Sequence, residues 1–232
     1  MPNLDLSPEQ LQLIAVNMIV LILSIAVHEF GHAMVADLLG DRLPRSEGRV
    51  TLNPIAHIDP IGTLALPLLG SIMAGGAFGW GRPVRVNPIA FTRRFRMRTG
   101  HMLVAAAGPA MNLLFATLIS LLLFTLMRTG VVRLGDHRQL VLGMINAITL
   151  NYALCLFNLV PASPLDGGAV LEGLLPDRAR PAYASYKQYS LFVAMAVMMI
   201  PTLGRTLIWG PAVRIYNLWG ADVLGLPRLW VP

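Results

Sequence analysis

The chain has 232 residues, of which 55% are hydrophobic and only 13% charged, and its formal net charge is +6. With a mean hydropathy of +0.62 and several apolar runs near the roughly 20 residues that span a bilayer, this composition indicates an integral membrane protein. The basic residues are almost all arginines in short loops between apolar runs, a pattern typical of cytoplasmic loops that argues against a nucleic-acid partner. The single cysteine, Cys155, excludes an intramolecular disulfide.

The distribution of apolar residues predicts an all-α polytopic membrane protein. We expect about four to six transmembrane or re-entrant helices and a small β-like re-entrant element after the first helix. No stretch between the runs is long enough to fold separately, so residues 1–232 are expected to form one membrane domain, with a core at about 10–175 and C-terminal membrane helices at about 185–225. The apolar runs lie at about 11–39, 61–78, 101–127, 139–160 and 189–209.

The first run contains the sequence His-Glu-Phe-Gly-His at residues 28–32. Residues four apart share a face of a helix, so the two imidazoles can hold one Zn²⁺ while Glu29 lies beside it, placed to deprotonate a water. Ionisable groups are costly inside an apolar segment, and metal binding would offset that cost. The helix is expected to end at Gly40.

The second run is interrupted by prolines and glycines and has arginines on both sides. They are Arg42, Arg45 and Arg49 before it and Arg82, Arg85, Arg93, Arg94, Arg96 and Arg98 after it. Both flanks then look cytoplasmic, which favours a re-entrant segment from about 50 to 90, with strand-prone stretches at 49–53 and 83–87. The alternative is a spanning helix that breaks the charge rule. This alternative stays open because the re-entrant arrangement places three arginines outside the cytoplasm, Arg128, Arg133 and Arg138.

The fourth run ends in Asn-Leu-Val-Pro-Ala-Ser-Pro-Leu-Asp-Gly-Gly at residues 158–168. A catalytic zinc site takes three protein ligands and leaves one position for water, and the first run supplies only two. Asp166 is a carboxylate at a helix end, loosened by prolines and followed by glycines that permit close backbone approach. If the first and fourth runs cross in the same direction, His28, His32 and Asp166 finish at one depth on the cytoplasmic side and converge.

These two motifs resemble the site-2 protease family of intramembrane zinc metalloproteases. The likeness covers about residues 10–175 and includes the Gly-x-x-x-Asn pattern at 108–112. A further set is similar to a compact bacterial and archaeal branch without PDZ or CBS domains. It consists of Thr51-Leu52-Asn53-Pro54, His57-Ile58-Asp59-Pro60, Phe78-Gly79-Trp80 and Pro83-Val84. Substrate selection would then depend on the core itself.

The resemblance implies that His28, His32 and Asp166 hold one Zn²⁺ per chain and that Glu29 is the general base, returning its proton to the leaving amine. It also implies that Asn158 could donate to the developing oxyanion, although a hydrogen bond between helices explains this residue equally well. Two further polar residues have simpler explanations. Asn112 is expected to have a structural role, and His57 is expected to form a hydrogen bond within its loop.

The implied function is hydrolysis of peptide bonds in transmembrane protein or peptide substrates, as in regulated intramembrane proteolysis. The implied location is a prokaryotic plasma (inner) membrane, with the active site toward the cytoplasmic side and the lipid bilayer as surroundings. A helical substrate hides its carbonyls, so the strand-prone stretches would pair with an unwound substrate. Two other classes stay open. A zinc-binding transporter or sensor has no need of Glu29 as a base, and an inactive scaffold would be expected to lack a ligand or Glu29.

Overall fold

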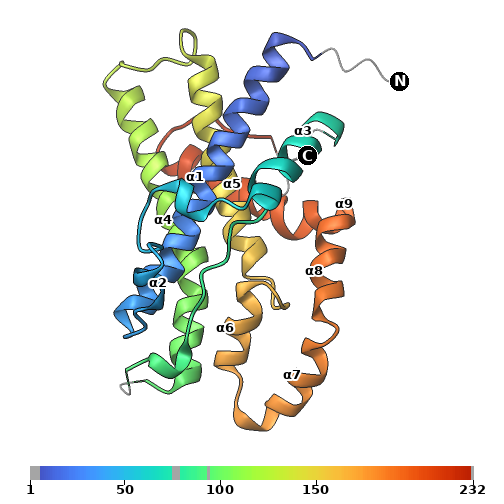
Figure 1. Ribbon diagram of the computed structural model, residues 1–232. Coiled ribbons are helices and arrows are strands. Elements are labelled where there is room, and N and C mark those ends of the chain that lie inside the picture. The colour runs from blue at the N-terminus through green and yellow to red at the C-terminus, as the bar shows by residue number, and fades with distance from the viewer. Residues whose placement is uncertain (1–5, 75–78, 93–94, 231–232) are drawn as a thin grey trace.

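The computed structural model describes residues 6–74, 79–92 and 95–230 (Figure 1). The described residues do not include the end of the second apolar run, with Phe78, or the two arginines Arg93 and Arg94. The described residues are mainly helical and contain no β-strand, so the β-like element predicted around 49–53 and 83–87 is not confirmed. The α-helices are α1 (Pro8–Leu38), α2 (Leu43–Ser46), α3 (Leu66–Ala74), α4 (Met97–Arg128), α5 (Arg138–Asn158), α6 (Asp166–Leu174), α7 (Arg180–Lys187), α8 (Ser190–Met199), α9 (Pro201–Gly204) and α10 (Gly210–Tyr216).

Three of these helices, α1, α4 and α5, are long and apolar enough to cross a membrane. They lie side by side, with α4 packed against both α1 and α5 (Figure 1). Helix α1 begins with a capping box. The Ser7 side chain accepts a hydrogen bond from the Gln10 N–H, and the Gln10 side chain accepts one from the Ser7 N–H. It ends as expected before Gly40, which adopts a φ of 107°.

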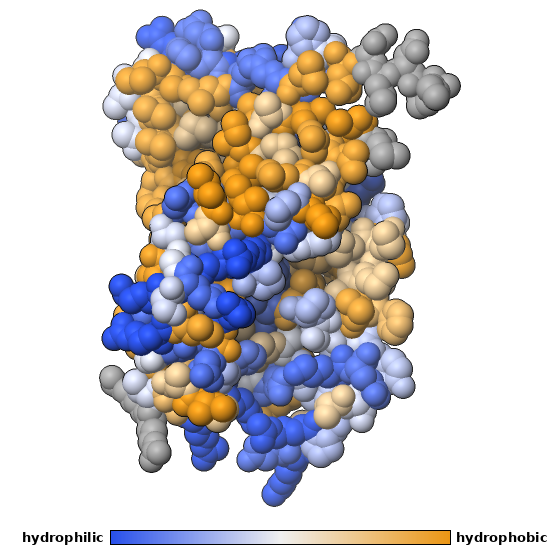
Figure 2. All heavy atoms as spheres, viewed as in Figure 1, coloured by the Kyte–Doolittle hydropathy of each residue, from blue (hydrophilic) through white to orange (hydrophobic). Residues whose placement is uncertain are grey.

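Apolar side chains cover most of the upper half of the face seen in Figure 2, whereas polar side chains gather over the lower part. The lower part contains α2, α6 and α7 (Figure 1). The molecule therefore has an apolar band of the kind that lipid covers, with a large polar region below it and a smaller polar cap above it (Figure 2).

The segment between α2 and α4 starts and finishes at the same end of the molecule. In Figure 1 the chain climbs from α2 to α3 and then descends to the 3₁₀ turn Pro88–Ala90 beside the start of α4. Short helical turns at Pro54–His57 and Pro60–Ala65 precede α3. This is the course that a re-entrant segment would follow.

The C-terminal apolar run is broken rather than straight. Helix α8 ends at Met199, and the helical stretch Pro201–Val223 continues at an angle of 89°. Proline lacks an N–H and clashes with the preceding turn, so Pro201 starts a new helix instead of extending the predicted run 189–209. The two arms pack through Val197, Ile208 and Tyr216 into a core shared with α4 and α5.

Candidate metal centre

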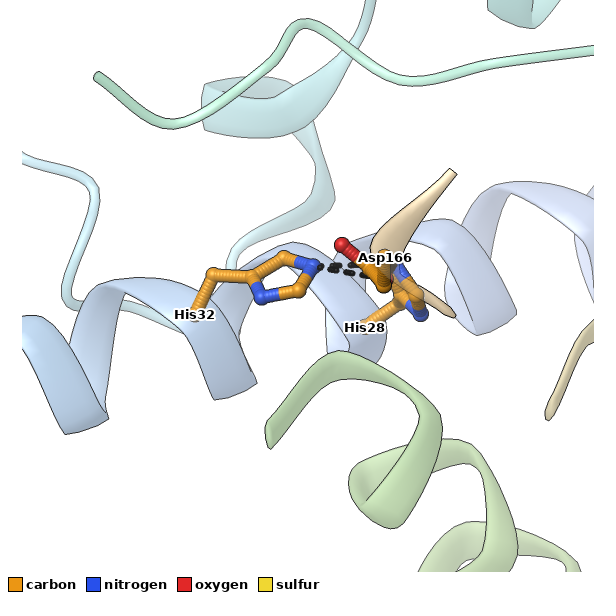
Figure 3. A group of neighbouring side chains, drawn as sticks. All are labelled: His28, His32 and Asp166. Atoms are coloured by element: carbon orange, nitrogen blue, oxygen red, sulfur yellow. Dashed lines mark hydrogen bonds and ion pairs between the residues drawn. The ribbon is translucent and has the colours of Figure 1, made fainter. Parts of the chain in front are cut away.

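Two histidines from α1 and an aspartate from the start of α6 point toward one another (Figure 3). The Nε2 atoms of His28 and His32 are 3.0 Å apart. The Oδ2 atom of Asp166 lies 3.2 Å from Nε2 of His28 and 3.3 Å from Nε2 of His32. The three residues thus form a group that could hold a metal ion.

Hydrogen bonds on the far side of each imidazole fix its orientation. The Nδ1 atom of His32 lies 2.8 Å from the Val104 carbonyl oxygen, which can only accept, so Nδ1 carries the proton. The Nδ1 atom of His28 lies 2.7 Å from Oδ1 of Asn112, whose amide nitrogen donates elsewhere, so the same assignment holds there. Both Nε2 atoms therefore present lone pairs to Asp166.

Three electron-pair donors this close together require a positive charge between them. The buried Oδ2 of Asp166 has no hydrogen-bond partner. Ligand atoms about 2.0–2.2 Å from a tetrahedral zinc lie roughly 3.3–3.5 Å apart, close to the separations observed here, so the donor set fits Zn²⁺.

A fully buried polar network supports the histidine pair from behind. The Asn112 amide of α4 donates to Oδ1 of Asn151 at 2.8 Å and to the Ser24 carbonyl at 3.2 Å. Asn151 of α5 donates in turn to the Ser24 hydroxyl at 2.8 Å. Asn112 is therefore structural, as predicted, and also orients His28. Asn151 is not among the predicted site residues, although an uncharged amide inside an apolar span is a usable signal.

The helices α1 and α4 approach closely at two glycines. A Cβ on Gly31 would lie 2.7 Å from the Ala107 carbonyl oxygen, and one on Gly108 would lie 2.4 Å from Nε2 of His32. Small residues at such a crossing let backbones come together. The absence of a side chain at Gly108 leaves the space that both imidazoles occupy.

The start of α6 and the loop before it are held largely through backbone groups. A Cβ on Gly167 would lie 2.3 Å from the Val160 carbonyl oxygen, which matches the predicted close approach. The Tyr183 hydroxyl donates to the Gly168 carbonyl at 2.6 Å, and the Ser163 N–H donates to the Ser190 hydroxyl at 2.9 Å. A residue of α7 thus holds the first turn of α6, which carries Asp166, and a residue of α8 holds the loop before it.

Glu29 lies beside the group and lines, with His28, a cavity of about 630 Å³ whose walls are mostly apolar side chains of α1, α5 and α8. Its Oε2 accepts a hydrogen bond from the Val84 N–H at 3.1 Å. Asn158 lines the same cavity, and its amide donates to the Leu154 carbonyl of its own helix at 3.0 Å. His57 bonds within its loop, as predicted, through a contact of 2.8 Å between Nε2 and the Thr51 carbonyl oxygen.

Comparison with known proteins gives a consistent result. Residues 137–201, which include Asp166, match the family described as Peptidase family M50. A Bacillus subtilis protein named "Putative zinc metalloprotease YwhC" is 37% identical over 194 residues, covering 82% of this chain and 83% of the relative. "Putative zinc metalloprotease Rip2" of Mycobacterium tuberculosis is 33% identical, covering 87% and 73%, and that of Mycolicibacterium smegmatis is 31% identical, covering 79% and 66%. No solved structure matches.

Proposed function

The chain belongs to Peptidase family M50, the site-2 protease family, and is a zinc metalloprotease of the membrane; from this premise we propose that it hydrolyses peptide bonds of transmembrane proteins or peptides. The observation that carries the proposal is the convergence of His28, His32 and Asp166 beside Glu29, at a cavity lined by apolar side chains. An apolar cavity suits a substrate that arrives from the bilayer.

In this proposal His28, His32 and Asp166 hold the zinc. When zinc is bound, it would lower the pKa of a water molecule and polarise the substrate carbonyl. Glu29 accepts the proton from the attacking water and then donates it to the leaving amine. Asn158 lines the cavity and has an amide that can turn from the Leu154 carbonyl toward the developing oxyanion.

The orientation follows from the arginines. Arg42 and Arg45 precede the segment 50–90, Arg82 and Arg85 lie in its second limb, and Arg98 follows it. The two ends of the segment lie at the same end of the molecule (Figure 1). By the positive-inside rule this end faces the cytoplasm, so the segment is re-entrant and the site opens toward the cytoplasmic side of a prokaryotic inner membrane. Residues 1–232 act as one membrane domain in this arrangement.

An unwound substrate would pair with the edge of the segment 83–87. Because the Val84 N–H faces Glu29, alternation along an extended stretch turns the Arg85 N–H the other way, where a substrate carbonyl can accept it. Arg85→Pro should therefore slow cleavage without loss of zinc, and unchanged cleavage would remove the pairing hypothesis.

The function is tested on protein purified in detergent, by measuring bound zinc and cleavage of a transmembrane substrate together. Glu29→Gln should keep one zinc per chain and lose cleavage, whereas Asp166→Ala should lose both. A wild type that binds zinc but cleaves none of several substrates, as a transporter or scaffold would, contradicts the proposal. Absence of bound zinc from the wild type would contradict the assigned ligands.

A further inference from the structure

Arg49 is a buried cation in the segment that follows α2. Its residue is only 3% exposed, and its guanidinium donates to the carbonyl oxygens of Ala56, Arg82 and Pro83, the last at 3.0 Å. The arginine pattern predicted an ordinary cytoplasmic loop residue at this position, and the structure instead places it between the two limbs of the segment 50–90. Burial lowers the pKa of Arg49, and the negative charge of Glu29 opposes that shift.

One peptide group connects Arg49 with Glu29. The carbonyl oxygen of Pro83 accepts from the guanidinium, and the N–H of the same peptide, which belongs to Val84, donates to Oε2 of Glu29 at 3.1 Å. A hydrogen bond to the carbonyl side of a peptide polarises the group and strengthens the bond that its N–H makes. The cation therefore acts on the carboxylate through a single peptide.

The limb that carries this peptide lies against α1. A Cβ on Gly81 would be 2.5 Å from Cγ2 of Ile25 and 3.3 Å from Cγ of Glu29. The Arg82 N–H donates to the His57 carbonyl at 2.9 Å, which joins the two limbs through their backbones. Arg49 closes the same junction from the other side, so the position of the Val84 N–H depends on it.

We propose that Arg49 is a positioning residue for Glu29: it holds the Pro83–Val84 peptide so that the Val84 N–H fixes Oε2 and leaves Oε1 for proton transfer. The inference rests on the proposed function, in which Glu29 is the general base. Arg49 itself contacts neither the candidate metal ligands nor the cavity.

The first test is kinetic. Arg49→Gln should retain zinc and the substrate KM while kcat falls by roughly 10- to 100-fold, because a misplaced base loses much of its contribution. Arg49→Lys keeps the charge and one donor nitrogen and should recover part of kcat. Arg45→Gln is the matched control, since it removes the same charge from an arginine that is 60% exposed, and Asp37 keeps its ion pair with Arg42. A kcat for Arg49→Gln equal to that of the control would overturn the proposal.

A second pair of variants keeps the test independent of damage at Arg49. Val84→Pro removes the N–H that Glu29 accepts, whereas Val84→Ala keeps it and removes only the side chain. We expect Val84→Pro to lower kcat as Arg49→Gln does and by more than Val84→Ala, and the double variant Arg49→Gln/Val84→Pro to be no slower than the slower of its two single variants. If kcat of the double variant instead fell by the product of the two single fold-losses, the two residues would act separately. That result would contradict the proposed connection through one peptide.

The last readout does not need activity. In protein labelled with ¹⁵N-valine, the Val84 amide signal is identified by its loss in Val84→Ala. Glu29→Gln and Arg49→Gln should both move this signal in the same direction, because each weakens the bond to the carboxylate, while Arg45→Gln should not. An unmoved signal in Arg49→Gln would overturn the inference, and it would do so whether or not the wild type cleaves any substrate.

Discussion

The two halves of the candidate metal centre are held in different ways. His28 and His32 stand on one long helix, and each imidazole is oriented by a group of α4. Asp166 instead begins the short helix α6. The Tyr183 hydroxyl holds the first turn of that helix at Gly168, and the Ser190 hydroxyl holds the preceding loop at Ser163. The histidine half thus depends on side chains buried among the three long helices, and the aspartate half depends on helices α7 and α8 beyond them.

This difference distinguishes two kinds of substitution that would weaken the metal site. A change in the helix interior should disturb the imidazoles together with the packing of α1, α4 and α5. A change in α7 or α8 should weaken the hold on Asp166 while the long helices stay as they are. Metal affinity reports on both halves, whereas thermal stability should respond mainly to the first.

The largest effect is expected at the closest approach of α1 and α4. Gly108→Ala would place a methyl group 2.4 Å from the His32 ring and 2.7 Å from the His28 ring. Both rings are fixed by their Nδ1 hydrogen bonds, so they must leave their positions and bound zinc should be lost. Gly143→Ala is the control, because its Cβ would meet only Val16, at 3.5 Å. Equal zinc content in the two purified variants would refute the close packing assigned to Gly108.

The next largest effect concerns the buried amide network. Asn112→Ala removes the acceptor for His28 and the donor to Asn151, so zinc affinity should fall by roughly 10- to 100-fold. Buried groups left without partners should also lower the stability by about 1–3 kcal/mol. Zinc affinity is measured by competition with a zinc chelator, and stability is measured by thermal melting in detergent.

A matched amide pair provides the control for Asn112. The Asn146 side chain donates to Asn17 at 2.8 Å and likewise joins α1 to α5, but it contacts neither histidine. Asn146→Ala should lower the melting temperature and leave zinc affinity unchanged. If both variants lost affinity alike, the effect of Asn112 would be one of general packing.

A smaller effect is expected at the aspartate half. Tyr183→Phe removes the hydrogen bond to the Gly168 carbonyl, which is worth about 0.5–1.5 kcal/mol, so zinc affinity should fall by roughly 2- to 12-fold with little change in melting temperature. Tyr189→Phe is the control, because Tyr189 is exposed. A zinc affinity of Tyr183→Phe equal to that of the control would show that α7 does not fix the first turn of α6.

The parts of the site that sequence could predict are those fixed by local geometry. The spacing of His28 and His32 places them on one helical face in any α-helix, and the need for a third ligand directed attention to Asp166. The groups that orient them depend on how α1, α4 and α5 are rotated against one another. No local pattern specifies that rotation, so the sequence does not predict the contact of Asn151 with Asn112, and it does not predict the burial of Arg49.

The fold shows the same division between local and distant causes. The ends of α1 agreed with capping rules, and the break at Pro201 had a local cause that the hydrophobic pattern of 189–209 concealed. The strand-prone stretches 49–53 and 83–87 show no strand. Strand propensity depends on a pairing neighbour, and here Arg49 occupies backbone carbonyls of the second stretch's limb.

The smallest expected quantity is the coupling between the two halves. Asn112 and Tyr183 share no partner, since one contacts His28 and the other contacts the backbone of Gly168. Their losses of zinc-binding free energy should therefore add in the double variant Asn112→Ala/Tyr183→Phe to within about 0.5 kcal/mol, or roughly twofold in affinity. A loss clearly below the sum would mean that the loop shifts to follow the displaced imidazole, so that the two halves adjust to each other through the ion. Additive losses would instead establish that the helices α1, α4 and α5 and the helices α7 and α8 position their ligands independently.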